Sequence, residues 1–171
     1  MNWVNVEIKA KCKDISAIEQ LLNELNADYK GVDHQIDTYF NVPSGRLKLR
    51  EGNIEHALIQ YDRGNQKGPK KSTINYYEPH RDKGLKETLT AAVGILVVVD
   101  KKRQIFFIDN VKFHLDRVEG LGTFAEIEAI DKEGTYTLEA LEAQCQHYMK
   151  LFGIEKEALI ANSYSDLLLA Q

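Results

Sequence analysis

The stretch that decides the predicted fold is His114–Glu128, which reads HLDRVEGLGTFAEIE. Two strand-like runs lie on either side of a short connection with two glycines, which suit a turn that needs positive φ. Residues two apart on a strand point to the same face, so Glu126 and Glu128 lie together. Asp116 can face them if the two runs pair as a hairpin. Three carboxylates on one face of a sheet repel one another unless water, basic residues or a metal ion faces them.

The same alternation predicts strands over most of the chain. Val4–Lys11 places apolar and charged residues at alternate positions, and Arg46–Arg50 alternates basic residues with leucine. Turn-like connections join most of the strands as hairpins, so the pairing should be antiparallel. Further strands are expected at Tyr29–Asn41, Ala57–Arg63, Ser72–Glu78, Ile95–Arg103, Gln104–Ile108, Val111–Val118 and Phe124–Asp131.

Helices are predicted between and after these strands, where apolar residues recur at helical spacing and capping residues precede them. An antiparallel sheet of this size, decorated with helices, is often curled or closed into a barrel that hides its edges. The helical segments are expected at Ile15–Asn26, Asp82–Ala92, Leu138–Phe152 and Lys156–Leu169.

Composition limits the classes of protein to consider. The 171 residues, 43% of them hydrophobic, suit one globular domain, and a net charge of -4 argues against a general nucleic-acid binder. Glu7, Lys9 and Lys11 occupy the positions where a signal peptide needs an apolar core. The longest apolar run, Ala91–Val99, is far shorter than the roughly 20 residues that span a bilayer. We therefore expect a cytoplasmic protein without nucleic-acid or membrane partners.

The charged residues of the predicted strands are sorted by sign. One strand carries Arg46, Lys48 and Arg50 without an acid, and another carries Glu126 and Glu128 without a base. For any single strand the ordinary explanation is a charged face in water, but a solvated face usually mixes both signs. A polyphosphate with divalent metal ions would satisfy both sets, because lysine and arginine hold phosphate oxygens while carboxylates hold the bridging metals.

Familiar catalytic motifs are absent from the sequence. There is no Gly-rich loop ending in Lys-Ser or Lys-Thr, which argues against a P-loop enzyme, and no Gly-x-Ser-x-Gly of acyl-transfer enzymes. The five histidines lack metal-ligand spacing, and surface or packed side chains explain them. His114 is the exception to watch, because it shares strand parity with Asp116.

Several short motifs occur in the same order as in a known family. The chain resembles CYTH-domain proteins of the triphosphate tunnel superfamily, and most closely their class IV adenylate cyclase-like branch. The residues that carry the resemblance are Val6–Lys11, Asp37–Phe40, Gly45–Arg50, Gly68–Lys70 followed by Ser72, Lys101–Arg103, His114–Gly122, Glu126–Glu128 and Ser163–Leu168.

The resemblance implies an α+β fold, a closed eight-stranded antiparallel β-barrel that forms a triphosphate tunnel and is decorated with helices. Residues 1–171 would form a single CYTH-like domain. The implied cofactor is magnesium or manganese. The implied partner is a small-molecule triphosphate, namely ATP, inorganic triphosphate or thiamine triphosphate, and a homodimer is compatible with the family.

The resemblance also implies roles for individual residues. The implied metal ligands are Glu7, Asp116, Glu126 and Glu128. The implied phosphate contacts are Lys9, Lys11, Arg46, Lys48, Arg50, Arg63, Lys70, Lys101 and Arg103. The implied catalytic residues are Lys11, Asp116 and Glu126.

Two positions depart from the family pattern. The usual Glu-x-Glu-x-Lys signature has Lys9 in place of its second acid, which removes one potential metal ligand and adds a phosphate contact. Tyr61 stands where many relatives have a lysine.

Three functions follow from these residues. The first is an adenylate cyclase-like reaction of ATP to cyclic AMP and pyrophosphate, and the second is hydrolysis of inorganic, nucleoside or thiamine triphosphate in the same tunnel. The third is a non-catalytic polyphosphate- or organophosphate-binding module, which Lys9 motivates. The sequence does not distinguish the two reactions, because they differ only in where the nucleophile lies along the phosphates.

Overall fold

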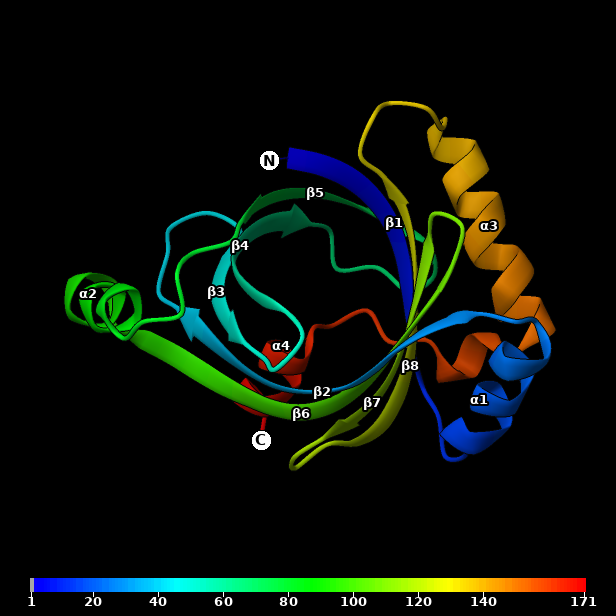
Figure 1. Ribbon diagram of the computed structural model, residues 1–171, viewed down its shortest axis with the longest axis horizontal. Helices are drawn as coiled ribbons and strands as arrows, with labels where there is room; N and C mark the ends of the chain where they lie inside the picture. Colours follow the sequence, from blue (N-terminus) through cyan, green and yellow to red (C-terminus); the bar gives the residue numbers. More distant parts are fainter. Residues whose placement is uncertain (1) are drawn as a thin grey trace.

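Residues 2–171, the part of the chain described by the computed structural model, form eight antiparallel strands closed into a barrel (Figure 1). The strands are β1 (Asn2–Lys11), β2 (Asp28–Phe40), β3 (Arg46–Glu51), β4 (His56–Arg63), β5 (Lys70–Tyr77), β6 (Ile95–Ile108), β7 (Val111–Val118) and β8 (Gly122–Asp131). Their order around the barrel is β1-β5-β4-β3-β2-β6-β7-β8, and β8 pairs with β1 to close it. The predicted fold class is confirmed.

The first three helices lie outside the ring of strands in Figure 1, whereas the fourth overlaps the ring in this view and its first residue, Tyr164, lines the barrel interior. The first and third helices pack on β8, and the third also packs on β1. The second helix buries none of its side chains and lies at the opposite side of the barrel. No helix in the described part of the chain is long and apolar enough to cross a bilayer. The helices are α1 (Ile15–Glu24), α2 (Gly84–Val93), α3 (Leu138–Leu151) and α4 (Tyr164–Leu169).

The C-terminal segment differs from the single helix predicted for Lys156–Leu169. A 3₁₀ turn covers Lys156–Ala158, the chain then continues in an extended form, and α4 begins only at Tyr164. Leu159 forms a β-bridge with Ala10, which keeps the backbone extended there. The side chains of Ser163 and Asp166 form a capping box at the start of α4. A bridge followed by a cap therefore divides the predicted helix.

Where the first and third helices cover the barrel, the strands carry apolar side chains on the outside and charged side chains inside. On β1, Val6 and Ile8 are buried in a cluster with helix residues such as Leu22 and Cys145. Alternation along a strand then directs the intervening Glu7 to the interior. The larger hydrophobic cluster therefore lies between this wall and the helices, whereas part of a second cluster lies in the barrel interior beside the charged side chains.

The segment His114–Glu128 forms the expected hairpin of β7 and β8. Its connection contains Gly120 and Gly122 at φ 78° and 100°, values that side chains rarely allow. Pairing places His114 opposite Glu126 and Asp116 opposite Phe124. The hairpin therefore directs acidic side chains into the barrel from both strands.

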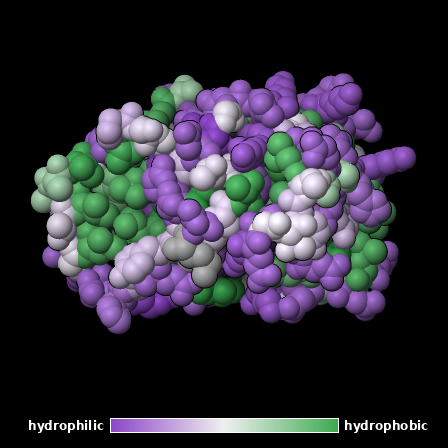
Figure 2. Space-filling view, turned by 90° about the horizontal axis from the view of Figure 1, so that it is seen from above, coloured by the Kyte–Doolittle hydropathy of each residue, from purple (hydrophilic) through white to green (hydrophobic). Residues whose placement is uncertain are grey.

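Figure 2 shows polar residues over most of the visible surface and a hydrophobic patch at the α2 end of the molecule. The exposed apolar side chains at this end include Val93, Ile95, Leu96 and Val98. They come from the end of α2 and the beginning of β6. The apolar run that the sequence shows at Ala91–Val99 is therefore divided between a helix and a strand at the surface.

Candidate functional site

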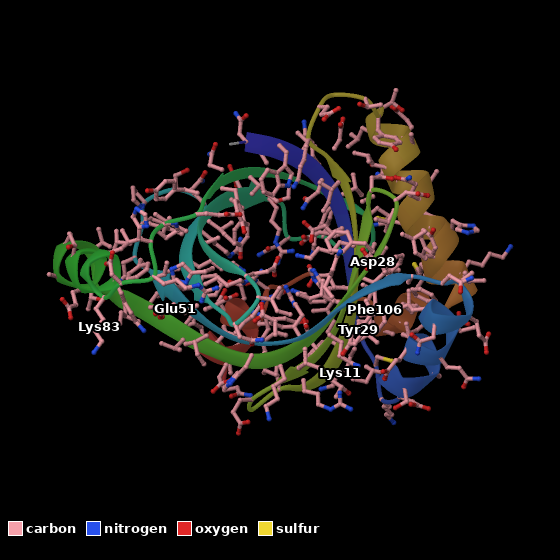
Figure 3. The ribbon with its side chains drawn as sticks, in the orientation of Figure 1. Lys11, Asp28, Tyr29, Glu51, Lys83 and Phe106 are labelled. Carbon is pink, nitrogen blue, oxygen red and sulfur yellow. The ribbon has the colours of Figure 1, made fainter. Side chains whose placement is uncertain are left out.

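The barrel interior contains a small, partly open cavity of about 100 Å³. Figure 3 shows nitrogen- and oxygen-bearing side chains directed into the ring of strands. Strands from around the ring contribute to its walls, so residues far apart in sequence converge. Nine of the residues with predicted roles line it, namely Glu7, Lys9, Lys48, Arg50, Arg63, Lys101, Arg103, Glu126 and Glu128.

Four residues with predicted roles do not line this cavity. Lys11 is exposed at the end of β1, where its Nζ donates to the carbonyl oxygen of Leu121 at 3.3 Å (Figure 3). Asp116 is fully buried and does not line the cavity. Arg46 and Lys70 contact the C-terminal segment instead, as described next.

The C-terminal segment lies against the ends of β3 and β5. Arg46 pairs with Asp166 at 2.7 Å, and Lys70 donates to the carbonyl oxygen of Ala161 at 2.7 Å. Burial and the nearby charges of Arg63 and Lys9 lower the pKa of Lys70 to about 7. Protonation of Lys70 is therefore sensitive to any anion that enters this end of the barrel.

Asp37 on β2 is the most heavily paired acid of the site, and the sequence assigned it no role. Its carboxylate accepts from Lys48 at 3.0 Å, from Arg50 at 2.9 Å and from Lys101 at 2.7 Å. Burial raises the pKa of Asp37, but the charges of Arg50, Lys101 and Lys48 outweigh it and hold the pKa well below its usual range. One buried carboxylate thus holds three predicted phosphate contacts in place.

Asp116, predicted as a metal ligand and catalytic residue, has both oxygens occupied in this structure. Arg103 donates to the two oxygens, each at 2.7 Å, and the hydroxyl of Tyr164 donates to one of them at 2.7 Å. Burial raises the pKa of Asp116, but Arg103 more than compensates, so the net shift is downward. Asp116 anchors an arginine and the first residue of α4.

The remaining predicted metal ligands lie on neighbouring strands of one wall. Glu7 is directly opposite Glu128 in the pairing of β1 with β8. Glu7 pairs with Arg63, and Glu128 accepts from the side-chain amide of Asn5. An arginine therefore holds one of these carboxylates and a side-chain amide holds the other, and both carboxylates face the cavity.

Glu126 lies next to His114, which lines the cavity as well. Oε2 of Glu126 is 3.5 Å from Arg103 Nη2 and 3.5 Å from His114 Nδ1. Burial, together with the charges of Arg103 and Lys112, lowers the pKa of His114. Neither ring nitrogen of His114 has a hydrogen-bond partner among residues 2–171.

The donor set fits a divalent cation in its chemistry. Glu7, Glu126 and Glu128 offer carboxylate oxygens on adjacent strands, which are the ligands that magnesium and manganese prefer. Within residues 2–171, no three acidic, histidine or cysteine side chains converge in the geometry of a bound ion. An ion would therefore have to replace the arginine and amide contacts that these carboxylates now make.

Tyrosines form a second group that sequence reasoning did not assign. Tyr39 and Tyr61 are joined through their hydroxyls at 3.3 Å, and Lys48 Nζ is 3.4 Å from the Tyr39 hydroxyl. Burial raises the pKa of Tyr61 well above its usual value, and the neighbouring Tyr39 raises it further. Lys9 lies 4.0 Å from the ring centroid of Tyr164. Strand parity with the charged residues is the signal that could have indicated Tyr39 and Tyr61, which lie on β2 and β4.

Residues 4–164 match the CYTH domain family. The chain belongs to the CYTH domain family. The predicted family is therefore confirmed, and the match covers nearly all of the barrel described above.

Two CYTH relatives are 27% identical in sequence. A protein of Methanocaldococcus jannaschii with the provisional name of an adenylate cyclase matches over 96% of this chain and 98% of its own. The adenylate cyclase CyaB of Aeromonas hydrophila matches over 95% of this chain and 87% of its own.

Solved structures share the CYTH barrel. A Pyrococcus horikoshii protein superposes with a TM-score of 0.79 at 24% identity, covering 95% of this chain and 98% of its own. A Hippeastrum protein, provisionally an adenylyl cyclase and described as having a dominant triphosphatase activity, superposes with a TM-score of 0.62. Its identity is 14%, with 98% of this chain and 94% of its own covered. At these identities the likeness establishes the fold.

Proposed function

We propose that this CYTH protein is a divalent-metal-dependent enzyme that acts on triphosphates, with conversion of ATP to cyclic AMP and pyrophosphate as its leading reaction. The observation that carries this proposal is the convergence of cations and carboxylates on one cavity inside the barrel. Charge-assisted hydrogen bonds from lysine and arginine are the usual means of holding phosphate oxygens. The cations are Lys9, Lys48, Arg50, Arg63, Lys101 and Arg103.

Ligand binding would exchange internal ion pairs for pairs with phosphate. Arg63 now pairs with Glu7, and Lys48 and Lys101 pair with Asp37. A triphosphate in the cavity brings several negative charges among these donors. Its oxygens can bind the lysines and arginines that line the walls, and the low-dielectric walls strengthen each interaction.

Magnesium or manganese is the cofactor that we propose, since CYTH enzymes generally depend on a divalent metal. Glu7, Glu126 and Glu128 would hold it, and when bound it would neutralise phosphate charge. The arginines and lysines on the other strands would fix the triphosphate in one orientation. Catalysis would come mainly from this positioning and from charge stabilisation.

In the cyclase reaction the ribose 3′-hydroxyl of ATP attacks the α-phosphorus. The new oxygen–phosphorus bond forms as the bond to the β-phosphate oxygen breaks, so pyrophosphate leaves and the hydroxyl proton is released. Donors along the cavity would stabilise the charge that develops on the leaving pyrophosphate. The names of both curated relatives support this reaction.

Hydrolysis is the second candidate function. Water would attack the terminal phosphorus and release orthophosphate from ATP, inorganic triphosphate or thiamine triphosphate. The Hippeastrum protein, which shares this fold, is described as a dominant triphosphatase. The same set of cations would hold the chain of phosphates in either reaction.

Product analysis distinguishes these functions. The purified protein is incubated separately with ATP, inorganic triphosphate and thiamine triphosphate, each with magnesium or manganese. Cyclic AMP with pyrophosphate establishes the cyclase, and orthophosphate establishes a triphosphatase and its substrate class. No product from any substrate, with a raised melting temperature in triphosphate, would indicate a binding module and overturn the enzyme.

A matched pair of variants connects turnover to the cavity. Lys101 lines the cavity, whereas the neighbouring Lys102 is exposed on the other face of β6. We expect Lys101→Met to lower turnover by at least about tenfold, as loss of a charge-assisted contact of ~1.5–3 kcal/mol implies. Lys102→Met should leave turnover unchanged. Equal rates in the two variants would contradict the assignment of the cavity.

A further inference from the structure

A second cavity, called the outer cavity below, adjoins the charged one at the end of the barrel where β1 begins. Its volume is about 440 Å³, compared with about 100 Å³ for the charged cavity. Arg50, Ile59, Ile74 and Glu128 line both, so the two spaces share a wall. Sites for organic ligands typically measure about 300–1,000 Å³. The outer cavity therefore has room for an organic group that the charged cavity lacks.

The two cavities differ in charge. Six lysine and arginine side chains and three carboxylates line the charged cavity, whereas three of each line the outer one. An excess of cations favours phosphates, and a balanced lining gives them no such advantage. Phosphates should therefore occupy the charged cavity, and the outer cavity should receive a part of the ligand that carries little charge.

Aromatic side chains from separate parts of the barrel line the outer cavity. Trp3 on β1 and Tyr76 on β5 have ring centroids 5.0 Å apart, with their planes tilted by 41°. Phe107 comes from the end of β6, a strand that pairs with neither β1 nor β5. Planar heterocycles stack on such rings whatever their identity, because each has a π face. This lining favours a planar ring.

The indole of Trp3 has unused contacts as well. Its Nε1 is buried and has no hydrogen-bond partner among residues 2–171, although a buried indole N–H usually finds an acceptor. The ammonium group of the exposed Lys132 lies 4.9 Å from the centroid of the Trp3 ring. A flexible lysine can yield this position to a ligand, and a heterocycle would bring acceptor atoms close to the indole.

The other end of the barrel is less suited to an organic group. The C-terminal segment lies there, with Asp166 paired to Arg46 and Ala161 accepting from Lys70. The cavity beside this segment measures about 230 Å³ and shares only Tyr39 with the charged cavity among residues 2–171. The larger space and the more extensive shared wall both lie at the Trp3 end.

We infer that the outer cavity binds the planar heterocycle of an organic triphosphate, so that such a substrate is preferred to inorganic triphosphate. The inference rests on the proposed function and refines it, because it gives the bound substrate a direction. The phosphate attached to the organic group lies beside Arg50 and Glu128, and the terminal phosphate points toward the C-terminal segment. Trp3, Tyr76 and Phe107 act as specificity-determining residues.

Fluorescence tests this inference without turnover, because Trp3 is the only tryptophan of the chain. The full chain is mixed with ATP, thiamine triphosphate or inorganic triphosphate in EDTA. The measurement is repeated with magnesium in a rapid-mixing instrument that records the emission before turnover. We expect an organic triphosphate to quench the emission strongly and inorganic triphosphate to leave it nearly unchanged. The organic triphosphate that binds more tightly identifies the heterocycle, a purine or that of thiamine.

Equal effects of the three ligands on the emission, or no effect of any of them, would overturn the inference. The product analysis above decides the reaction separately. Product from ATP without a change in emission would overturn the inference and leave the proposed enzyme intact. Quenching by ATP without any product would retain the outer cavity as a binding site and overturn the enzyme.

A pair of variants gives a second measurement. Trp3→Leu removes the ring but keeps an apolar side chain, and calorimetric titration should show organic triphosphate binding about 5–150-fold more weakly, as the loss of one stacking contact implies. Its affinity for inorganic triphosphate should stay unchanged, which also shows that the charged cavity is folded. Tyr29→Leu is the control, because Tyr29 is exposed and packs on Phe106 outside the barrel (Figure 3). Equal changes for both ligands in Trp3→Leu would contradict the inference.

Discussion

Asp37 holds three cations with a single buried carboxylate, so its contribution can be tested at one residue. Replacement with asparagine leaves Lys48, Arg50 and Lys101 close together without their counter-ion. Removing one partner from a buried ion pair typically destabilises a protein by about 3–5 kcal/mol. The free energy of unfolding therefore depends strongly on this side chain.

We expect Asp37→Asn to lower the melting temperature markedly and inorganic triphosphate to raise it more than in the wild type. The anion replaces the missing negative charge in the variant, whereas it competes with Asp37 in the wild type. Thermal unfolding with and without inorganic triphosphate measures both effects. Asp28→Asn is the control, because Asp28 is an exposed residue of the same strand. A smaller triphosphate effect in Asp37→Asn than in the wild type would refute the exchange of ion pairs.

The lowered pKa of Lys70 predicts that triphosphate binding depends on pH. Its pKa is lowered to about 7 in the free protein, and a nearby phosphate would raise it, so binding takes up a proton once the pH exceeds about 7. Affinity for triphosphate should therefore fall between pH 7.5 and 9, by up to about tenfold per pH unit. Lys70→Arg, which stays charged throughout, should show a flatter profile. Calorimetric titration at several pH values measures the affinity for triphosphate. If the affinity of the wild type and of Lys70→Arg changes equally with pH, Lys70 is not the cause of the pH dependence.

At the scale of elements, α4 connects the end of the chain to the barrel. Its capping box begins at Ser163, its first residue Tyr164 donates to Asp116, and Asp166 pairs with Arg46. A helix of six residues is too short to be stable alone, so these contacts hold it in place. The cap and the two polar contacts therefore act together.

We expect the Ser163→Ala substitution to destabilise α4. The loss of a serine N-cap costs about 0.5–2 kcal/mol, and here it removes the hydrogen bonds at the start of α4. We expect faster amide hydrogen exchange in residues 164–169, with little change in β7 and β8. Hydrogen exchange followed by mass spectrometry detects this. Ser44→Ala, in an exposed turn, is the control, and equal protection in both variants would argue against the cap as the anchor.

The faces of the strands could be predicted from sequence, but the partners of individual side chains could not. Alternation in β1 and β3 correctly separated the buried apolar face from the charged one, because the period of two is a local property. Asp37 was missed because alternation alone does not give the register that places Arg50 opposite it, and because Lys101 lies 64 residues along the chain on another strand. Asp116 and Lys11 show the same limit, since strand parity does not reveal which charge faces which.

Across the whole molecule, the acidic and basic side chains inside the ligand-free barrel pair with one another. Carboxylates that could hold a metal ion now hold arginines, as in Glu7 with Arg63, and cations that could hold phosphate now hold carboxylates. Each ligand would release groups that the other requires. Metal and triphosphate should therefore bind cooperatively.

We expect manganese to tighten inorganic triphosphate binding, and triphosphate to tighten manganese binding by the same factor, about 5–150-fold. Calorimetric titration of each ligand with and without the other closes this thermodynamic cycle. Arg63→Met should reduce the coupling, because Glu7 is then free of its arginine before any ligand binds. Independent binding of the two ligands in the wild type would contradict the proposed exchange.

The placement of the larger hydrophobic cluster outside the barrel has a consequence for how such a protein can diversify. Val6 and Ile8 stabilise the fold beneath the helices, while Glu7 between them faces the cavity. Neighbouring positions on one strand are therefore subject to separate selection, one for folding and the next for chemistry. A library that randomises inward-facing residues other than Asp37, Asp116 and their cation partners should retain many folded members, and it could yield barrels for other anions on the same scaffold.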